Sequence, residues 1–499
     1  MKNSLSFIMP AWPLITVLIL VFILSSVANA RVSPKLGVFQ GVTSLHSENN
    51  DAVGEQYLAE GDFKAYYYKQ TLDHFNYRPD SYATFKQKYM INNKYWGGKY
   101  ENAPIFVYLG DEAPLGNSYR YVGFMSENAE RFRALLVYIE HRYYGESIPF
   151  RSREEAFSNA STLGYFSSAQ AIADYAAILI HIKKTLRARY SPVIAVGGSY
   201  GGMLASWFRL KYPHVVLGAL ASSAPILYFD DITPNDGYFT VATRDFQEES
   251  QSCYETIKES WDEMDRIASL PDGLSILSQT FNTCSPLSDV DQLKDRLVGI
   301  YSAAAQYSSP LVTLLCQGID GAPQGSDILT RIHEGIVTAY QGRFTCFPVT
   351  FDGAKSETYE GWSWQTCTEM VMPIGRGNET MFFPSPFNLT EFNQQCKKSY
   401  GVEPRSHWAT TYYGGRDIKL VLERFGSNII FSNGLKDPYS SGGVLEDLSK
   451  SLVAITTEKG THCMDILNSN PTDPKWLVKQ REEEVKIIKG WLNKYYKDL

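Results

Sequence analysis

A serine placed between glycines is the strongest chemical signal in this sequence. The residues "GGSYGG" (197–202) give the pattern G-x-S-x-G, with Ser199 at its centre. The apolar run "PVIAV" precedes them and "MLASWFRLKY" follows, so the serine stands where a buried strand turns into a helix. That context is typical of a nucleophile elbow, in which a strained turn holds the hydroxyl above the end of a sheet. The alternative, a glycine-rich turn with a serine that only caps the helix, fits this context less well.

A serine hydroxyl becomes a nucleophile only beside a histidine base, which a carboxylate must orient. The histidines that follow the serine are His214, His333, His407 and His462. His462 stands in "GTHCMD", after the last predicted strand, where hydrolases with the order Ser, Asp, His keep their base. Asp437 follows the preceding predicted strand and is the candidate carboxylate, although an Asp-Pro pair is also common in turns. Asp465 lies three residues after His462 and is the rival carboxylate, better suited to fixing its own loop.

The oxyanion formed in an acyl transfer needs two hydrogen-bond donors, usually backbone N–H groups. Tyr200, the residue after the serine, is expected to supply the first at the start of the predicted helix. The second is expected from "YLGDEAP", the loop after the third predicted strand, with Gly110 or Asp111 as the donor. Lipases and esterases often carry the motif HGGG in this loop. Its absence here counts modestly against those two classes.

Parallel strands are needed to bring these residues to one edge of a sheet. Strand and helix patterns alternate along two stretches of the chain, which predicts a parallel α/β sheet. The predicted strands are 63–75, 84–96, 104–110, 135–141, 192–198, 215–225, 428–434 and 452–460. The predicted helices are 126–134, 168–189, 203–212 and 473–496, and the second of them has Ser167 or Ser168 as its expected N-cap.

The alternation stops in the middle of the chain, which predicts an insertion in the α/β core. The expected segments are a signal peptide (1–30), a flexible lead-in or propeptide (31–60), the first part of the core (61–232), a helical cap insertion (233–404) and the second part of the core (405–499). The cap contains Cys253, Cys284, Cys316, Cys346, Cys367 and Cys396. Six clustered cysteines in an oxidising compartment predict three disulfides, with all 15 pairings open. A zinc site is less favoured because no Cys-x-x-Cys pair occurs, and no metal or cofactor is expected.

The N-terminus and the net charge indicate where the protein acts. Lys2, an apolar stretch and the triplet Ala-Asn-Ala at 28–30 form a signal peptide, whereas an uncleaved anchor is disfavoured by Pro10 and Pro13. No later stretch is apolar for long enough to span a bilayer. The formal charge of −7 argues against nucleic acid or an anionic membrane as a partner. We therefore expect the secretory pathway, ending in a vacuole or lysosome or outside the cell, with glycans on the sequons at Asn159, Asn378 and Asn388.

Taken together, these motifs resemble the prolylcarboxypeptidase and dipeptidyl-peptidase II family of serine peptidases, and most of all its plant lysosomal Pro-X carboxypeptidase-like members. The resemblance covers about 60–497 and rests on "LDHF" (72–75), "EHRYYGES" (140–147), "GGSYGGMLA" (197–205), "WQTCTEM" (364–370), "NIIFSNGLKDPYSSGG" (428–443) and "GTHCMDI" (460–466). It implies an α/β-hydrolase fold with a helical, disulfide-bonded cap and the triad Ser199, Asp437 and His462. It also implies the pairs Cys253–Cys316, Cys284–Cys346 and Cys367–Cys396.

The chain departs from the family pattern around the expected site. The family usually has Asn-Glu-Gly where this chain has Asp111, Glu112 and Ala113, and Trp where it has Tyr439. A second histidine and an arginine usually follow the catalytic histidine, and here they are Cys463 and Leu467. The triad is untouched by these changes. They affect the proline pocket and the pH dependence.

The expected function is that of a serine exopeptidase that cleaves after proline and releases the last residue of peptides ending in Pro-X. The proline ring would lie in an aromatic pocket with Met203 and Tyr439, and Glu112 is a candidate for binding a substrate amine. Its partners would be peptides with a penultimate proline and a second copy of the chain in a homodimer. The alternatives are a dipeptidyl peptidase that releases N-terminal X-Pro or X-Ala, an esterase or lipase on the same fold, and a non-catalytic binding protein, which would be expected to lack the serine or the histidine.

Overall fold

The computed structural model describes residues 62–116, 118–307, 309–340, 345–349 and 356–499. The predicted signal peptide and lead-in (1–30 and 31–60) lie outside these residues. Among the helices described, none is long and apolar enough to cross a membrane.

An eight-stranded mixed sheet forms the centre of the core. The strands are β1 (Lys64–Thr71), β2 (Thr84–Asn92), β3 (Ile105–Leu109), β4 (Leu135–Ile139), β5 (Val193–Gly198), β6 (Gly218–Ser222), β7 (Ile429–Gly434) and β8 (Leu452–Thr457). Their order is β1-β2-β4-β3-β5-β6-β7-β8. The pairs β1·β2 and β2·β4 are antiparallel, and every pair from β4 to β8 is parallel.

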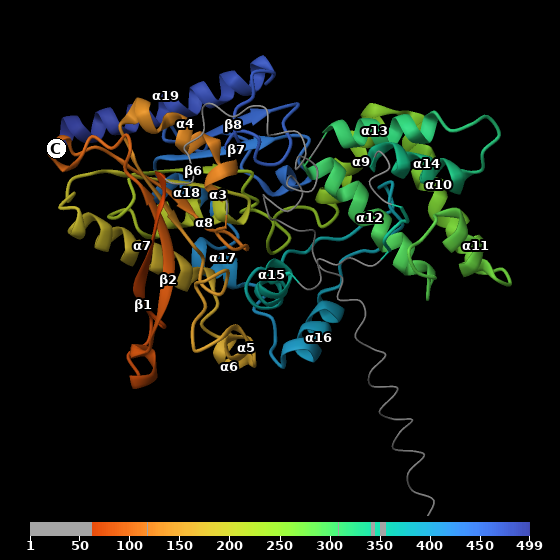
Figure 1. The fold of residues 1–499 in the computed structure, drawn as a ribbon, viewed down its shortest axis with the longest axis horizontal. Coiled ribbons are helices and arrows are strands. Elements are labelled where there is room, and N and C mark those ends of the chain that lie inside the picture. Colours follow the sequence, from red (N-terminus) through yellow and green to blue (C-terminus); the bar gives the residue numbers. More distant parts are fainter. Residues whose placement is uncertain (1–61, 117, 308, 341–344, 350–355) are drawn as a thin grey trace, which may run out of the picture. The chain divides into compact units, whose positions relative to one another are not determined.

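Helices cover both faces of this sheet, which explains why its central strands are continuous apolar runs. Along β3, Ile105, Val107 and Leu109 face one buried cluster, whereas Phe106 and Tyr108 face another. The first cluster includes side chains of α7 (Ser168–Thr185) and α8 (Tyr200–Lys211). The second includes side chains of α4 (Gly123–Phe132) and α19 (Lys475–Asp498). Figure 1 shows α19 and α4 on one side of the sheet and α7 on the other.

The chain between β6 and β7 is mostly helical, and short helices also lie in the connections between the core strands. The helices of this insertion are α9 (Gly237–Glu249), α10 (Gln251–Ala268), α11 (Gly273–Thr280), α12 (Val290–Tyr307), α13 (Ser309–Asp320), α14 (Ile328–Tyr340), α15 (Glu357–Thr368), α16 (Leu389–Tyr400), α17 (Trp408–Tyr413) and α18 (Ile418–Phe425). The remaining short helices are α3 (Ser118–Tyr121), α5 (Arg153–Ala156), α6 (Ala160–Leu163), η3 (Pro79–Tyr82), η4 (Lys99–Glu101) and η6 (Pro438–Gly442). Helices α9 to α14 gather into one group (Figure 1). From here on, the cap means this group of helices, which is smaller than the cap insertion predicted at 233–404.

Three disulfides join helices and loops of the insertion. They are Cys253–Cys316, Cys284–Cys346 and Cys367–Cys396, the pairs that the family resemblance implies. The sequence separations of 63, 62 and 29 residues are long. Cross-links that close such loops typically contribute about 2–4 kcal/mol each, mainly by restricting the unfolded chain.

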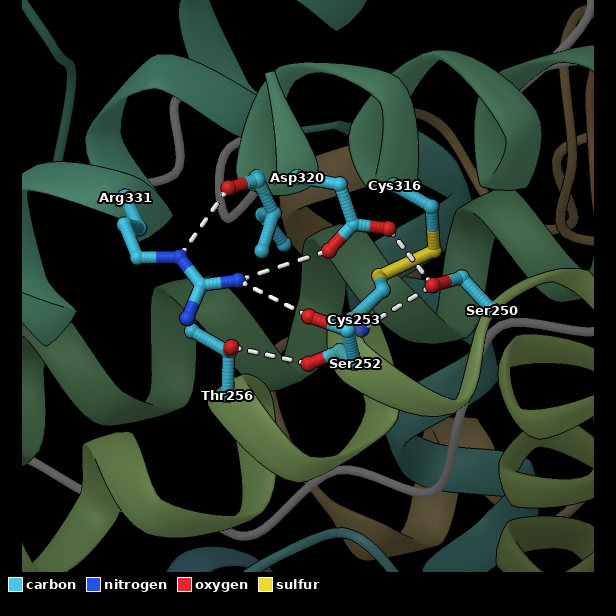
Figure 2. The surroundings of a disulfide bond; sticks show 8 residues. Ser250, Ser252, Cys253, Thr256, Cys316, Asp320 and Arg331 are labelled. Atoms are coloured by element: carbon cyan, nitrogen blue, oxygen red, sulfur yellow. Dashed lines mark hydrogen bonds and ion pairs between the residues drawn. A yellow bond between two sulfur atoms is a disulfide. The ribbon is translucent and has the colours of Figure 1, made fainter. Parts of the chain in front are cut away.

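Polar contacts surround the first of these disulfides (Figure 2). Cys253 lies in α10 and Cys316 in α13. The hydroxyl of Ser250 accepts a hydrogen bond from the Cys253 backbone at 3.2 Å and donates to the Asp320 carboxylate at 2.5 Å. Arg331, from α14, forms an ion pair with Asp320 at 3.4 Å. The disulfide and these contacts together tie α10, α13 and α14 to one another.

The α/β-hydrolase fold class expected from the sequence is confirmed by this sheet and its helices. Each of the eight predicted strands is present, and each is shorter than its predicted range. Ser167 is the N-cap of α7, and its side chain accepts a hydrogen bond from the backbone of Gln170. The division into a core and a cap at 233 and 404 stays a prediction about domains.

Candidate active site

Ser199 occupies a strained turn between β5 and α8. Its backbone angles are φ 58° and ψ −125°, a conformation that non-glycine residues rarely adopt. The turn also brings backbone segments very close together. A Cβ at Gly197 would lie 2.1 Å from the carbonyl oxygen of Gly201, and one at Gly202 would lie 2.7 Å from that of Ser222. Glycine is required at 197 and 202 for this reason, which explains the residues that flank the serine.

The parallel strands bring three loops to the same edge of the sheet. Ser199 follows β5, Asp437 follows β7 and His462 follows β8, and these strands run parallel, with β6 between β5 and β7. Two backbone hydrogen bonds join the last two loops, from Leu435 to Thr457 at 2.8 Å and from Lys436 to Gly460 at 3.0 Å. The carboxyl ends of parallel strands are where α/β folds keep their reactive groups.

Asp437 orients His462 through a direct hydrogen bond. His462 Nδ1 lies 2.6 Å from Asp437 Oδ2, and both side chains are fully buried. The other oxygen of Asp437 accepts a hydrogen bond from the Tyr439 backbone at 3.0 Å, which fixes the carboxylate. Burial lowers the pKa of His462, but Asp437 and Cys463 together outweigh burial, so the pKa lies above its usual value.

Asp465, the rival carboxylate, has a different partner. Its Oδ1 accepts a hydrogen bond from the hydroxyl of Ser222 at 2.5 Å. The carbonyl oxygen of Asp465 accepts from Arg481 at 2.9 Å, so α19 also holds this loop. The geometry thus joins His462 to Asp437 and gives Asp465 a place in the support of the loop.

The end of β6 links the elbow to the histidine loop. The Ser222 carbonyl accepts a hydrogen bond from the Ser199 backbone at 2.8 Å. The Cys463 sulfur lies 3.8 Å from the same carbonyl oxygen. The Cys463 backbone donates to the Ser223 hydroxyl at 2.9 Å. The residue after the candidate base and the candidate nucleophile therefore contact one carbonyl group.

The loop after β3 lies against the elbow, as the oxyanion prediction requires. A Cβ at Gly201 would lie 3.0 Å from the carbonyl oxygen of Leu109 and 3.5 Å from the Asp111 side chain. The Gly110 N–H donates to the Ile139 carbonyl at 2.9 Å, as part of the β3·β4 edge. That bond engages the Gly110 N–H. Of the two candidates in this loop, only Asp111 therefore remains as a second oxyanion donor, with Tyr200 as the first.

The motif "EHRYYGES" supports both the loop after β3 and the elbow. Glu140 accepts hydrogen bonds from the Leu115 backbone at 3.0 Å and the Ser147 hydroxyl at 2.6 Å. The His141 ring lies 3.1 Å from the Tyr200 hydroxyl, which also accepts from Gln365 at 2.8 Å. Burial lowers the pKa of His141 to about 4, so this ring stays uncharged.

Arg142 in the same motif belongs to a buried ion pair. Its guanidinium lies 2.6 Å from Asp174, and both side chains are fully buried. The arginine also donates to the carbonyls of Leu72 and Tyr165 at 2.8 and 2.9 Å. Arg142 therefore joins α7 to the N-terminal strands and has a structural role, which sequence reasoning did not assign.

The cap reaches the histidine loop through the end of α12. The backbone N–H of His462 donates to the backbone carbonyl of Gln306 at 2.9 Å. The Tyr307 ring meets the His462 ring edge-on, with centroids 5.6 Å apart. Tyr238 of α9 donates from its hydroxyl to the Gln306 side chain at 2.9 Å. Sequence reasoning missed these cap residues. The sequence of this helix does not say which loop it contacts.

The predicted pocket residues lie close to this site. Tyr439 is buried, with its ring centroid 5.9 Å from that of His462 and 4.9 Å from that of Tyr238. Met203 is buried one helical turn after the serine and donates its backbone N–H to the Ser199 carbonyl at 2.9 Å. Glu112 is fully buried in the loop after β3. Within the described ranges, no three His, Cys, Asp or Glu side chains are grouped as a metal site would need.

Comparison with known families agrees with the fold described above. The family model described as serine carboxypeptidase S28 matches residues 70–484. This chain belongs to the S28 family. The matched range begins near the end of β1 and ends in α19, so it includes β2 to β8 and the insertion.

Curated relatives match along most of their own length. The lysosomal Pro-X carboxypeptidase of Homo sapiens is 37% identical over 503 residues, which cover 96% of this chain and 97% of that protein. The protein of the same name from Pongo abelii is 38% identical and covers 87% of this chain and 89% of its own length. Prolyl carboxy peptidase like protein 5 of Caenorhabditis elegans is 31% identical, with 89% and 93% covered. The family expected from the sequence is therefore confirmed.

Proposed function

We propose that this S28 family member is a serine carboxypeptidase that removes the last residue from peptides ending in Pro-X. The observation that carries the proposal is the buried Asp437–His462 hydrogen bond at the sheet edge where Ser199 forms the elbow. Its relatives named lysosomal Pro-X carboxypeptidase support the cleavage site after proline. Membership of a peptidase family does not favour the alternative function of an esterase or lipase.

The reaction follows from the roles of the three side chains. Ser199 Oγ attacks the carbonyl carbon of proline while His462 takes its proton, and the N–H groups of Tyr200 and Asp111 stabilise the oxyanion. His462 then gives the proton to the leaving nitrogen, the C–N bond breaks, and the last residue departs as a free amino acid. Water, activated by the same histidine, hydrolyses the acyl-enzyme. Asp437 holds the imidazole in the tautomer that this sequence of steps needs.

Aromatic side chains form the wall proposed for the proline pocket. Tyr439 meets Tyr228 and Tyr238 edge-on, with ring centroids 6.3 and 4.9 Å apart. A proline ring packs well against aromatic faces, and Met203 offers an adaptable neighbour. Tyr439 replaces the tryptophan usual in the family, so we expect a pocket of altered shape.

The compartment and modifications are further parts of this proposal. The relatives named lysosomal support an acidic compartment of the secretory pathway. Asn159, Asn378 and Asn388 are exposed, so glycans at these sequons would meet no steric barrier. A homodimer stays a prediction that size-exclusion chromatography with light scattering can test.

Product analysis by mass spectrometry tests the proposed function. The substrates are one proline-containing peptide with free ends, the same peptide with a blocked N-terminus and the same peptide with a C-terminal amide. We expect release of the last residue from the free and the N-blocked peptides. Release of an N-terminal dipeptide from the free peptide, with no product from the N-blocked one, would instead indicate a dipeptidyl peptidase.

A further inference from the structure

Glu112 is a buried carboxyl group for which the proposed reaction gives no role. Its side chain is fully buried, and neither carboxylate oxygen has a hydrogen-bond partner among the other residues that the structure describes. Burying a polar group without a partner costs free energy, more so if it is charged. A group of this kind beside a catalytic centre suggests a partner that arrives with the substrate.

The groups around Glu112 place it at the proposed site. Its charge interacts with that of Asp111 beside it and with His462 across the site. Tyr307 interacts with both Glu112 and Asp437, and its ring contacts His462. The other titratable groups that interact with Glu112 are Tyr108 on β3 and Tyr144 in the loop after β4. Glu112 therefore lies within electrostatic range of the histidine of the proposed triad, in the loop whose Asp111 side chain lies against Gly201 of the elbow.

The protonation state decides what this group can bind. Burial, followed by the neighbouring Asp111 carboxyl, raises the pKa of Glu112 well above its usual value. His462 has the opposite effect and is weaker, so the net shift favours the uncharged form of Glu112. An uncharged carboxyl donates a hydrogen bond through its O–H. The ligand that suits it best is an acceptor, and a carboxylate is the strongest one a peptide carries.

The chemistry of the leaving group supplies that carboxylate. His462 delivers its proton to the nitrogen of the departing residue, so groups near His462 line the leaving side of the scissile bond. In a Pro-X substrate, the departing residue is the last one. Its α-carboxylate is only two bonds from that nitrogen. A side chain near His462 is therefore also near the place that the C-terminal carboxylate of a bound substrate would take.

We propose that Glu112 recognises the free C-terminal carboxylate of the substrate by donating a hydrogen bond from its protonated carboxyl group. This inference rests on the proposed carboxypeptidase function and adds the residue that would make the enzyme selective for chain ends. It reverses the expectation that Glu112 binds a substrate amine. An ammonium group needs an ionised acceptor, whereas ionising a carboxyl group as deeply buried as Glu112 is unfavourable.

Two blocked tripeptides test this assignment: Z-Ala-Pro-Phe with a free carboxylate and Z-Ala-Pro-Phe-amide. The quantity to measure is the ratio of kcat/KM for the free acid to that for the amide, from pH 4.5 to 8. Titration of His462 affects both substrates and cancels in the ratio. For the wild type, we expect the ratio to favour the free acid at low pH and to fall as pH rises through the pKa of Glu112.

Variants of Glu112 separate this role from a structural one. Glu112→Ala should lower the ratio at pH 5 by about 10- to 100-fold, the usual effect of losing a hydrogen bond to a charged group. Glu112→Gln keeps a neutral donor, so its ratio should stay closer to that of the wild type and lose its dependence on pH. Glu484→Gln is the matched control, since Glu484 is equally buried and also has an oxygen without a hydrogen-bond partner in the described part of the chain. Its ratio should match that of the wild type at every pH.

The outcomes distinguish this inference from the function on which it rests. If the wild type released neither phenylalanine nor its amide, the proposed function would fail, and the inference with it. If the wild type cleaved both substrates and Glu112→Ala lowered both rates equally, only the inference would be overturned. A Glu112→Gln ratio that kept the pH dependence of the wild type would also overturn it. So would a selective loss of N-terminal dipeptide release from Ala-Pro-Phe-amide in Glu112→Ala.

Discussion

The elbow and the histidine loop are positioned in different ways. Ser199 is fixed by its immediate neighbours in the chain, because β5 enters the turn, α8 leaves it and two glycines allow the close approach. His462 is held by groups that are distant in sequence: the Asp437 carboxylate, the Gln306 carbonyl and the Tyr307 ring. The difference suggests that the nucleophile keeps its geometry when the cap changes, whereas the base does not.

The largest expected effect comes from removing the nucleophile. Ser199→Ala should lower kcat by on the order of a million-fold, since the attacking oxygen is lost while the fold remains. Ser206→Ala is the matched control, because Ser206 is a buried serine of the same helix whose hydroxyl donates only to the Met203 carbonyl in the described structure. Steady-state kinetics should show near-normal turnover for the control. Residual activity above one per cent in Ser199→Ala would show that another residue attacks.

The carboxylate beside the base should have the next largest effect. Asp437→Asn keeps the size of the side chain, but its amide favours the wrong histidine tautomer, so we expect a loss of roughly ten-thousand-fold in kcat. Asp465→Asn should have a much smaller effect, because Asp465 bonds to Ser222 rather than to the base. If kcat fell further in Asp465→Asn than in Asp437→Asn, the assignment of the carboxylate would be wrong.

The contact between the cap and the base should have a moderate effect. Tyr238→Phe removes the hydrogen bond to the Gln306 side chain and loosens the carbonyl that holds His462. A net hydrogen bond is worth about 1 kcal/mol, which corresponds to about a fivefold loss in kcat. Tyr301→Phe is the control, because the Tyr301 hydroxyl has no partner in the part of the cap that the structure describes. Equal kinetics for the two variants would show that the cap does not position the base.

The smallest expected effect is the dependence of stability on pH. Buried carboxyl groups in both the core and the cap should contribute to it. Burial raises the pKa of Asp111 in the core and of Asp245 in the cap to about 7. It does the same for Glu369, which bonds to the N-terminus of α7. The folded protein therefore holds protons that the unfolded chain releases near pH 4, and stability is lost as pH rises from about 4 to 7.

Calorimetry can measure this pH dependence. The Tm at pH 5 should exceed that at pH 8 by several degrees, and Glu369→Gln should reduce the difference because one titrating group is gone. An equal Tm at both pH values would mean that these carboxyls are not protonated in the folded state.

The contrast between elbow and loop also explains what the sequence could predict. The strand, the glycines and the helix around Ser199 are contiguous, so their pattern identifies the turn without a structure. Chain order and strand positions were enough to pair Asp437 with His462. The Gln306 contact joins residues 156 positions apart in the chain (462 − 306), and it forms only when the cap has folded. The Gly110 N–H shows another limit, because strand pairing uses the donor that the loop pattern suggested for the oxyanion.

One labelling experiment tests the central claim that Ser199 attacks the bond after proline. A diphenyl phosphonate built on Z-Ala-Pro reacts with a serine nucleophile only when its proline analogue lies at the cleavage position, and the Z-Ala-Val phosphonate is the matched probe. We expect peptide mapping to find the Z-Ala-Pro adduct on Ser199 alone, at one label per chain, and little reaction with the valine probe. An adduct on another residue, or equal labelling by the two probes, would contradict the account.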